Sequence, residues 1–299
     1  MATAATVTRI NLKNIMFLTD FSEPSEAALP YAITIARGYG AKLHGFHVLL
    51  PAPSTYMTPE LTVTAIEAEE ESAQAGMQKL DAQLSGVQHE TSVERGMSIW
   101  PAVERAIKDE KIDLLVLGTH GRTGASKLLL GSVAEEIFRR SPIPVLTIGP
   151  GVKAQAHNDA RFRRVLFATD FSKHSLAAFP YAVSLAEENE ARLVMLHVIP
   201  EAKISGAEML GEIPKGSPLS QLKALLPKEA ELWCRPEAVV EYGDAAARIL
   251  EEAKSRGADL IVLGVRDAGG HIGAATHLGR ATAHKVVAHA PCPVLTVRG

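Results

Sequence analysis

The stretch Gly118–Glu136, GTHGRTGASKLLLGSVAEE, holds the residues of this chain best suited by type and spacing to bind an anion. Two residues separate Gly118 from Gly121, nine separate Gly121 from Gly131, and Ser132 follows directly. Glycines allow positive φ angles and let main-chain N–H groups approach an anion closely. Ser132 opens SVAE, a capping-box pattern, so we expect a helix to start there with its N-terminal N–H groups exposed. A helix that starts after a glycine-rich loop can hold a phosphate.

A simpler interpretation of this stretch stays open. The glycines can serve only as a flexible turn, and Ser132 only as a helix cap. The spacing also differs from the better-known phosphate loops, because it has neither the Gly-Lys-Ser/Thr ending of a P-loop nor the pattern G-x-G-x-x-G.

The chain contains two copies of one unit. IMFLTDFSEPSEAALPYAITIA, from Ile15 to Ala36, aligns without a gap with VLFATDFSKHSLAAFPYAVSLA, from Val165 to Ala186. KIDLLVLG likewise matches GADLIVLG, and SPIPVLTIG matches APCPVLTVR, in the same order and at similar spacing. Such self-similarity predicts a tandem duplication, with domains over residues 9–150 and 161–299. The polar stretch GPGVKAQAHNDA between them is typical of a linker.

Each copy alternates strand and helix patterns. In the first copy, short apolar or β-branched runs predict strands over residues 14–19, 42–50, 89–95, 112–119 and 144–149. Apolar residues at helical spacing predict helices over 22–40, 59–84, 98–111 and 132–141. This alternation predicts an α/β fold, a doubly wound parallel sheet with helices on both faces. In such sheets ligands bind outside the carboxyl ends of the strands, where TDFS, HVLLP and GTHGRTG lie.

A proline falls inside the first helical pattern of each copy, at Pro30 and Pro180. Proline in a helix interior costs about 3 kcal/mol. Because both copies carry it at the same place, we expect a kinked or late-starting helix there.

These blocks together resemble the universal stress protein family. The resemblance rests on Gly-x2-Gly-x9-Gly-Ser after the strand LLVLG, on TDFS after the first strand and on the closing PVLT strand. It covers nearly the whole chain, once per copy. It implies a Rossmann-like fold with five parallel strands in each domain. It also implies an ATP-binding regulatory module that acts in stress adaptation together with an unidentified protein partner.

The resemblance also assigns roles to residues of the first copy. It implies that Asp20 holds the ribose, that Leu18 and Thr19 line the same strand end, and that the backbone of Val48 meets the adenine edge. The residues expected around the sugar and the phosphates are Leu117, Gly118, Gly121, Gly131, Ser132, Val133 and Ala134. The expected ligand is ATP, with or without Mg²⁺. Capping of its own helix, shared with Ser22, stays open as the alternative role of Asp20.

The second copy departs from the motif. Gly264 matches Gly118, but Asp267 stands where the first copy has Gly121, the next spacer is longer, and Arg280 follows Gly279 in place of Ser132. A carboxylate repels a phosphate, so we expect that this copy does not hold ATP in the same way. Either it takes another ligand or it serves only as a structural partner.

The sequence favours binding over catalysis. His120, Arg122 and Lys127 can contact phosphates, but the loop contains no carboxylate, so only Asp20 is available to hold a metal ion or a water molecule. We therefore expect at most slow ATP hydrolysis. The alternatives are a slow ATPase or other nucleotide-handling enzyme of the same superfamily, and an interaction scaffold that has lost nucleotide use.

No metal site is predicted from the histidines. His44 and His47 are three apart on a strand and hence on opposite faces. His284 and His289 are five apart, which is a poor ligand spacing on a helix. We expect Cys292, which lies between two prolines, to be buried and unreactive.

Composition excludes several classes of partner. With a net charge of −3, the chain has no basic footprint for nucleic acid or an anionic membrane. No apolar run approaches the roughly 20 residues of a membrane span. Two cysteines are too few for a disulfide framework, so we expect a reduced compartment, the cytoplasm.

The closing strands of the two copies, PVLTI and PVLTV, are expected at sheet edges, which are costly to leave open. The family resemblance implies that such strands pair across a twofold axis. We therefore predict an intramolecular pseudo-dimer, which is compatible with a further homodimer.

Overall fold

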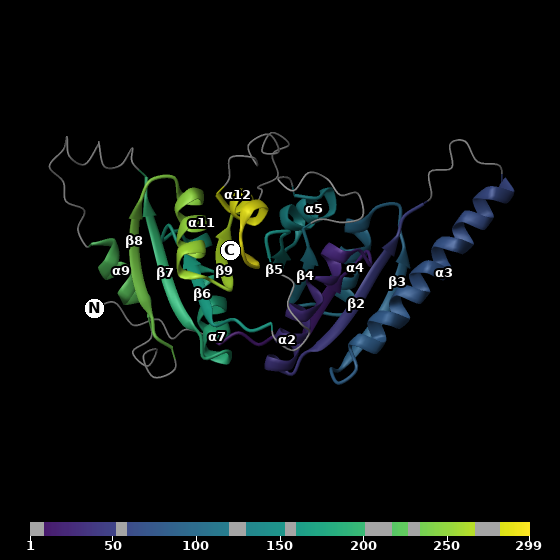
Figure 1. Cartoon of the computed structure of the whole chain (residues 1–299), viewed down its shortest axis with the longest axis horizontal. Coiled ribbons are helices and arrows are strands. Elements are labelled where there is room, and N and C mark those ends of the chain that lie inside the picture. Colours follow the sequence, from purple (N-terminus) through teal and green to yellow (C-terminus); the bar gives the residue numbers. More distant parts are fainter. Residues whose placement is uncertain are drawn as a thin grey trace. The chain divides into compact units, whose positions relative to one another are not determined.

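The computed structural model describes residues 9–51, 59–119, 130–152, 160–200, 217–226, 234–266 and 282–299 (Figure 1). The chain divides into two compact units. The first unit comprises Asn11–Pro150 and the second Arg161–Gly299. Residues 9, 10, 151 and 152 group with the second unit, and Ala160 groups with the first.

The first unit is a parallel sheet with the strand order β3-β2-β1-β4-β5. Its elements are β1 (Asn14–Leu18), α1 (Glu23–Glu26), α2 (Leu29–Tyr39), β2 (Lys42–Leu49), α3 (Pro59–Gln83), β3 (His89–Arg95), α4 (Ile99–Asp109), β4 (Leu114–Gly118), α5 (Ser132–Arg140) and β5 (Val145–Ile148). Strand order reverses direction at β1, from which the chain goes first to β2 and later to β4. Such a switch point leaves a crevice at the carboxyl ends of the strands.

The second unit repeats this topology with the order β10-β9-β6-β7-β8, again with parallel pairs. Its elements are β6 (Arg164–Ala168), α6 (Lys173–Leu176), α7 (Phe179–Glu188), β7 (Arg192–Ile199), α9 (Pro218–Leu225), β8 (Glu237–Tyr242), α11 (Ala245–Arg256), β9 (Leu260–Val265), α12 (Thr282–His289) and β10 (Val294–Arg298). The predicted α/β fold with two doubly wound parallel sheets is confirmed.

The central strands are buried on both faces. Ile15, Met16 and Phe17 of β1 are almost fully buried, as are Leu115 and Val116 of β4 beside it. A strand that is apolar at successive positions needs cover on both sides of the sheet, which the helices supply. These strands form the rigid base on which the loops at their carboxyl ends are held.

The two prolines mark helix starts. A single short turn, α1, precedes α2, which begins at Leu29 with Pro30 in its first turn. The second unit repeats this with α6 and α7, and Pro180 follows Phe179 at the start of α7. Proline is tolerated in the first turn because the N–H group that it lacks has no partner within the helix there. The prediction of a late-starting helix is confirmed.

Helix α3 is the outer helix beside β3 in Figure 1, and it packs along β2 and β3. Its acidic run from Glu67 to Glu71 is largely exposed. Within the part of the chain that the structure describes, no helix combines the length and the apolar character needed to cross a membrane.

Candidate functional site

The turn TDFS after β1 is built from side-chain to backbone hydrogen bonds. The Thr19 hydroxyl accepts from the N–H of Phe21 at 2.9 Å and from the hydroxyl of Ser25 at 2.9 Å. Phe21 has a φ of 60°, in the left-handed region that residues other than glycine rarely adopt. Phe171 in the second unit has a φ of 61° and the same bond, to Thr169. Both copies thus keep one uncommon turn that aims the preceding carboxylate out of the sheet.

That carboxylate, Asp20, is held by Ser22. Its Oδ1 accepts from the N–H of Ser22 at 3.0 Å and from its hydroxyl at 2.5 Å. Ser22 is itself the N-cap residue of α1, and its hydroxyl accepts from the N–H of Ser25 at 3.4 Å. The capping role that was open for Asp20 therefore belongs to Ser22, and Asp20 lies beside the cap.

His47 supports the same turn from β2. Its Nδ1 lies 2.7 Å from the carbonyl oxygen of Thr19, and its ring lies 4.6 Å from the ring of Phe21, centroid to centroid. On the other side of Phe21 lies Gly76 of α3, where a Cβ atom would lie 2.8 Å from the Phe21 ring. His197 repeats the bond to Thr169 at 2.8 Å in the second unit. Both histidines are therefore packed and hydrogen-bonded in the same way.

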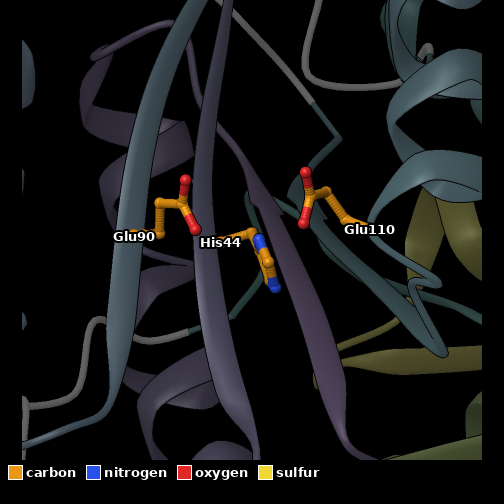
Figure 2. A group of neighbouring side chains, drawn as sticks. All are labelled: His44, Glu90 and Glu110. Carbon is orange, nitrogen blue, oxygen red and sulfur yellow. The ribbon is translucent and has the colours of Figure 1, made fainter.

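His44 lies on the opposite face of β2 from His47. It is buried, and its neighbours are Asn14, Glu90 and Glu110 rather than the turn (Figure 2). The prediction that His44 and His47 face opposite sides is confirmed.

The start of α5 differs from the expected capping box. Gly131 is the N-cap residue, and among the residues that the structure describes no side chain caps this end of the helix. The N–H of Gly131 donates to the carbonyl oxygen of Thr119 at 2.8 Å, and its own carbonyl accepts from the N–H of Glu135 at 2.8 Å. The helix begins at Ser132 as predicted, but the capping role predicted for the Ser132 hydroxyl is wrong. Anchoring to the end of β4 places Gly131 at the cap, so the serine becomes the first helical residue.

Gly118, at the end of β4, is required by packing. A Cβ atom there would lie 2.6 Å from the carbonyl oxygen of Pro24 in α1. At Gly264, its counterpart in β9, a Cβ atom would lie 2.0 Å from the carbonyl oxygen of His174. Both glycines therefore let the short first helix approach the sheet, and in the first unit this closes one side of a cavity.

The cavity lies at the carboxyl ends of β1, β2 and β4 and has a volume of about 400 Å³. The structure brings ten of the eleven predicted site residues around it: Leu18, Thr19, Asp20, Val48, Leu117, Gly118, Gly131, Ser132, Val133 and Ala134. Gly121 lies outside the described residues, as do His120, Arg122 and Lys127.

The cavity has further walls that the sequence analysis did not name. Glu69, Ser72 and Ala73 of α3 line it, as do His47 and Ile99. Ala73 is buried within an otherwise exposed, acidic stretch, and such an apolar residue at helical spacing is the signal that could have revealed this wall.

The cavity has two electrically different sides. Asp20 and Glu69 place carboxylates on the side of β1 and α3. The first residues of α5 line another side of the cavity, and no side chain of the described residues caps this helix end. The first N–H groups of a helix carry a partial positive charge. The negative part of a ligand is therefore favoured at Ser132, Val133 and Ala134.

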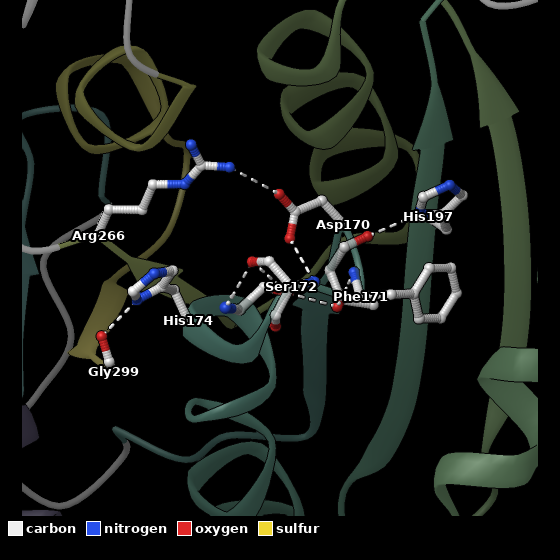
Figure 3. A network of polar contacts seen from close by, with 9 residues as sticks. Asp170, Phe171, Ser172, His174, His197, Arg266 and Gly299 are labelled. Atoms are coloured by element: carbon white, nitrogen blue, oxygen red, sulfur yellow. Dashed lines mark hydrogen bonds and ion pairs between the residues drawn. The ribbon is translucent and has the colours of Figure 1, made fainter.

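The second unit has a smaller cavity, of about 150 Å³, at the equivalent place. Its lining residues include Asp170, Ser172, His174, Gly264, Arg266 and Thr282. Figure 3 shows Arg266 reaching towards Asp170, and its Nη2 lies 3.8 Å from the carboxylate Oδ2. In the same view His174 bonds through Nδ1 to the carbonyl oxygen of Gly299. Asp170, the carboxylate that corresponds to Asp20, thus already has an ion-pair partner, Arg266, within its own unit.

The pKa of Asp170 reflects these partners. Burial on its own raises the pKa, but hydrogen bonds from Ser172 and Ser175 and the charge of Arg266 outweigh burial, so the pKa lies below its ordinary value. The carboxylate is therefore ionised at neutral pH and already has a cationic partner.

The helix before the last strand shows which residues of the two copies correspond to each other. The N–H of Ser141 donates to the carbonyl of Ile137, and that of Ala290 to the carbonyl of Val286. Counting back from this match, Ala283 corresponds to Ala134. Arg280 then corresponds to Gly131 rather than to Ser132, one residue from the match expected from the sequence. Asp267, Gly279 and Arg280 themselves lie outside the described residues.

Both cysteines are free and buried. Burial raises the pKa of Cys292 to about 12 and that of Cys234 to about 11, so both thiols stay protonated at neutral pH. The prediction of a buried, unreactive Cys292 is confirmed.

Comparisons with known proteins agree with the duplicated architecture. A model of the universal stress protein family matches residues 11–149 and again residues 161–298. A universal stress protein of Mycolicibacterium smegmatis is 28% identical over 300 residues, which cover 95% of this chain and 96% of that protein. One of Methanocaldococcus jannaschii is 34% identical over 143 residues, 46% of this chain and 81% of that protein.

A solved structure shares the fold along its whole length. The crystal structure of a universal stress protein from Archaeoglobus fulgidus superposes with a TM-score of 0.72 at 23% identity, covering 97% of each chain. The two matches to the family model together span most of the sequence. The chain therefore belongs to the universal stress protein family and carries two consecutive domains of it.

Proposed function

We propose that the first copy binds ATP, with or without Mg²⁺, and that the chain acts as a nucleotide-dependent regulatory module in stress adaptation. The observation that carries this proposal is that Asp20, Val48 and the uncapped start of α5 border one cavity. Its volume of about 400 Å³ falls within the range of roughly 300–1,000 Å³ typical of small-molecule sites.

The charges of the cavity support one orientation of the nucleotide. The phosphates lie at the start of α5, where the backbone N–H groups of Ser132, Val133 and Ala134 donate to them. The ribose hydroxyls lie at Asp20, because a carboxylate accepts hydrogen bonds from hydroxyl groups. The adenine then lies along the end of β2, near Val48 and the α3 wall.

Ser22 and His47 act on this site through the turn. Ser22 fixes the Asp20 carboxylate with two hydrogen bonds, and His47 holds the carbonyl of Thr19. Both contacts come from the chain itself, so the position of the ribose-binding group does not depend on contacts with the nucleotide. Such preorganisation lowers the entropic cost of binding.

The duplicated chain offers a matched test. We expect Asp20→Ala to weaken ATP binding by about tenfold or more, since hydrogen bonds to a charged group contribute about 1.5–3 kcal/mol. Asp170→Ala removes the equivalent carboxylate from the second copy and is expected to leave ATP affinity unchanged. Calorimetric titration of both variants measures this difference. Equal ATP affinity in wild type and Asp20→Ala would refute the assignment.

A further inference from the structure

A second cluster of ligand-forming side chains lies near the amino end of β2, away from the cavity at its carboxyl end. His44 of β2, Glu90 of β3 and Glu110 at the end of α4 each place one ligand atom within 4.8 Å of the others. Figure 2 shows the two carboxylates on either side of the imidazole. The imidazole is buried, whereas both glutamates are exposed.

The second copy has an ion pair at the position that corresponds to this cluster. The sheet register pairs His44 with Glu90 in the first copy and Val194 with Glu237 in the second. Arg256, at the end of α11, stands where the first copy has Glu110, and its Nη1 lies 2.7 Å from Glu237 Oε1. The first copy therefore replaces the arginine–glutamate ion pair with a histidine and two carboxylates, of which Glu90 forms an ion pair with Lys42. Two carboxylates so close together repel each other, and a cation between them would offset this repulsion.

A hydrogen bond defines the nitrogen that His44 can offer. Asn14 Nδ2 donates to the carbonyl oxygen of Lys111 at 3.4 Å, which turns Asn14 Oδ1 towards His44 Nε2 at 3.3 Å. Because this amide oxygen only accepts, Nε2 is the protonated nitrogen and Nδ1 carries the lone pair. Metal-binding histidines commonly donate their other N–H to such an oxygen, which fixes the tautomer.

We propose that His44 Nδ1 and the carboxylates of Glu90 and Glu110 bind a divalent transition-metal ion of the zinc class. One imidazole nitrogen and two carboxylate oxygens form a three-ligand set that leaves a further position for water. Zinc ligands at 2.0–2.2 Å from the ion lie about 3.3 Å from one another in a tetrahedron. The exposed glutamate side chains can move to close the remaining distance, while the buried imidazole stays fixed.

Lys42 competes with the metal ion. Its ammonium group bonds to Glu90 Oε2. The metal ion must therefore share Glu90 with Lys42 or displace it. Removing this ammonium group is expected to tighten metal binding, an effect that a merely structural cluster would not show.

The test is a titration of the full-length, nucleotide-free chain with Zn²⁺ by calorimetry, repeated with Co²⁺ and its visible absorption. The main variant is Glu110→Gln, which removes an exposed ligand and leaves the folded core untouched. His89→Gln is the matched control, because His89 adjoins Glu90 on β3 but bonds to Asp81 and Val87. Thermal unfolding without metal shows that each variant is folded.

We expect wild type and His89→Gln to bind Zn²⁺ equally, with Glu110→Gln weaker by at least about tenfold at one site. His44→Gln is expected to act like Glu110→Gln, and Lys42→Met is expected to bind more tightly than wild type. Co²⁺ absorption should report a nitrogen ligand that is lost in His44→Gln. Equal Zn²⁺ binding in wild type and Glu110→Gln, or no binding by wild type, would overturn the proposal. Since these variants lie away from the cavity, ATP affinity serves as a separate measurement.

Discussion

The two copies share a turn but differ in the space above it. In both, an aspartate follows the first strand, a serine N–H donates to it, and a phenylalanine with positive φ packs on a histidine. The cavity above this turn measures about 400 Å³ in the first copy and about 150 Å³ in the second. The linings differ as well: α3 contributes Glu69, Ser72 and Ala73 to the first cavity, whereas Arg266 lines the second.

The second copy keeps the turn but has less space above it. Arg266 and His174 line the smaller cavity, where Arg266 lies against Asp170 and His174 donates to the carbonyl oxygen of Gly299. A volume of about 150 Å³ is below the range of roughly 300–1,000 Å³ typical of ligand sites. An intact turn is thus insufficient evidence that a copy binds nucleotide.

The largest effect is expected from Gly131→Arg, which gives the first copy the residue that corresponds to it in the second. Gly131 is half-buried at the N-cap of α5, next to the proposed phosphate position. A long side chain there fills the phosphate position, so we expect ATP affinity to fall at least about 100-fold, or about 2.7 kcal/mol. Calorimetric titration measures the loss. Thermal unfolding is the control for folding, and a folded variant with wild-type affinity would contradict the account.

A smaller effect, and a contrast between the copies, is expected from Gly118→Ala and Gly264→Ala. Each methyl group meets a backbone carbonyl, 2.6 Å away at Pro24 and 2.0 Å away at His174. We expect each change to lower the free energy of unfolding by roughly 1–3 kcal/mol, as overpacked sites do. Only Gly118→Ala displaces the helix that carries Ser22, so only it should weaken ATP binding, by about tenfold. Denaturant unfolding and calorimetry together test this pair, and equal ATP affinity in both variants would count against it.

The smallest effect is expected from Arg266→Ala in the second copy. The ion pair with Asp170 spans 3.8 Å, and its side chains are 74% and 59% exposed. Exposed pairs contribute at most about 1 kcal/mol, so stability at pH 7 should change by less than that. The folded-state pKa of Asp170 is lowered, so its stabilising contribution is present above the unfolded pKa and is lost as the pH falls through the folded pKa.

When the pH falls from 7 to 3, the free energy of unfolding is therefore expected to fall less in Arg266→Ala than in wild type. Unfolding curves at the two pH values measure this difference, which added salt should not enlarge. A larger loss on acidification in Arg266→Ala than in wild type would show that the ion pair has been misjudged.

Much of the fold could be predicted because its signals are local. The apolar run at Ile15–Leu18 is buried on both faces, and the proline at position 30 marks the start of α2. The predicted capping role of Ser132 is wrong because a contact between residues distant in sequence decides where the helix begins. The bond between Gly131 and Thr119, at the end of β4, sets where the helix begins, and no pattern of neighbouring residues reveals it.

The parts that could not be predicted depend on residues distant in sequence. Glu69 and Ala73 reach the cavity only because α3 packs along β2 and β3. His44, Glu90 and Glu110 meet through strand register and the end of α4, which spacing along the chain does not specify. The pairing of the two closing strands in a pseudo-dimer stays a prediction.

The stoichiometry of ATP binding tests the central claim most directly. Calorimetric titration of the full-length, nucleotide-free chain should give about one ATP per chain. Asp170→Ala should leave that site unchanged, and Gly131→Arg should remove it. Two equivalent sites, or a site that survives in Gly131→Arg and disappears in Asp170→Ala, would show that the first copy is not the nucleotide-binding copy.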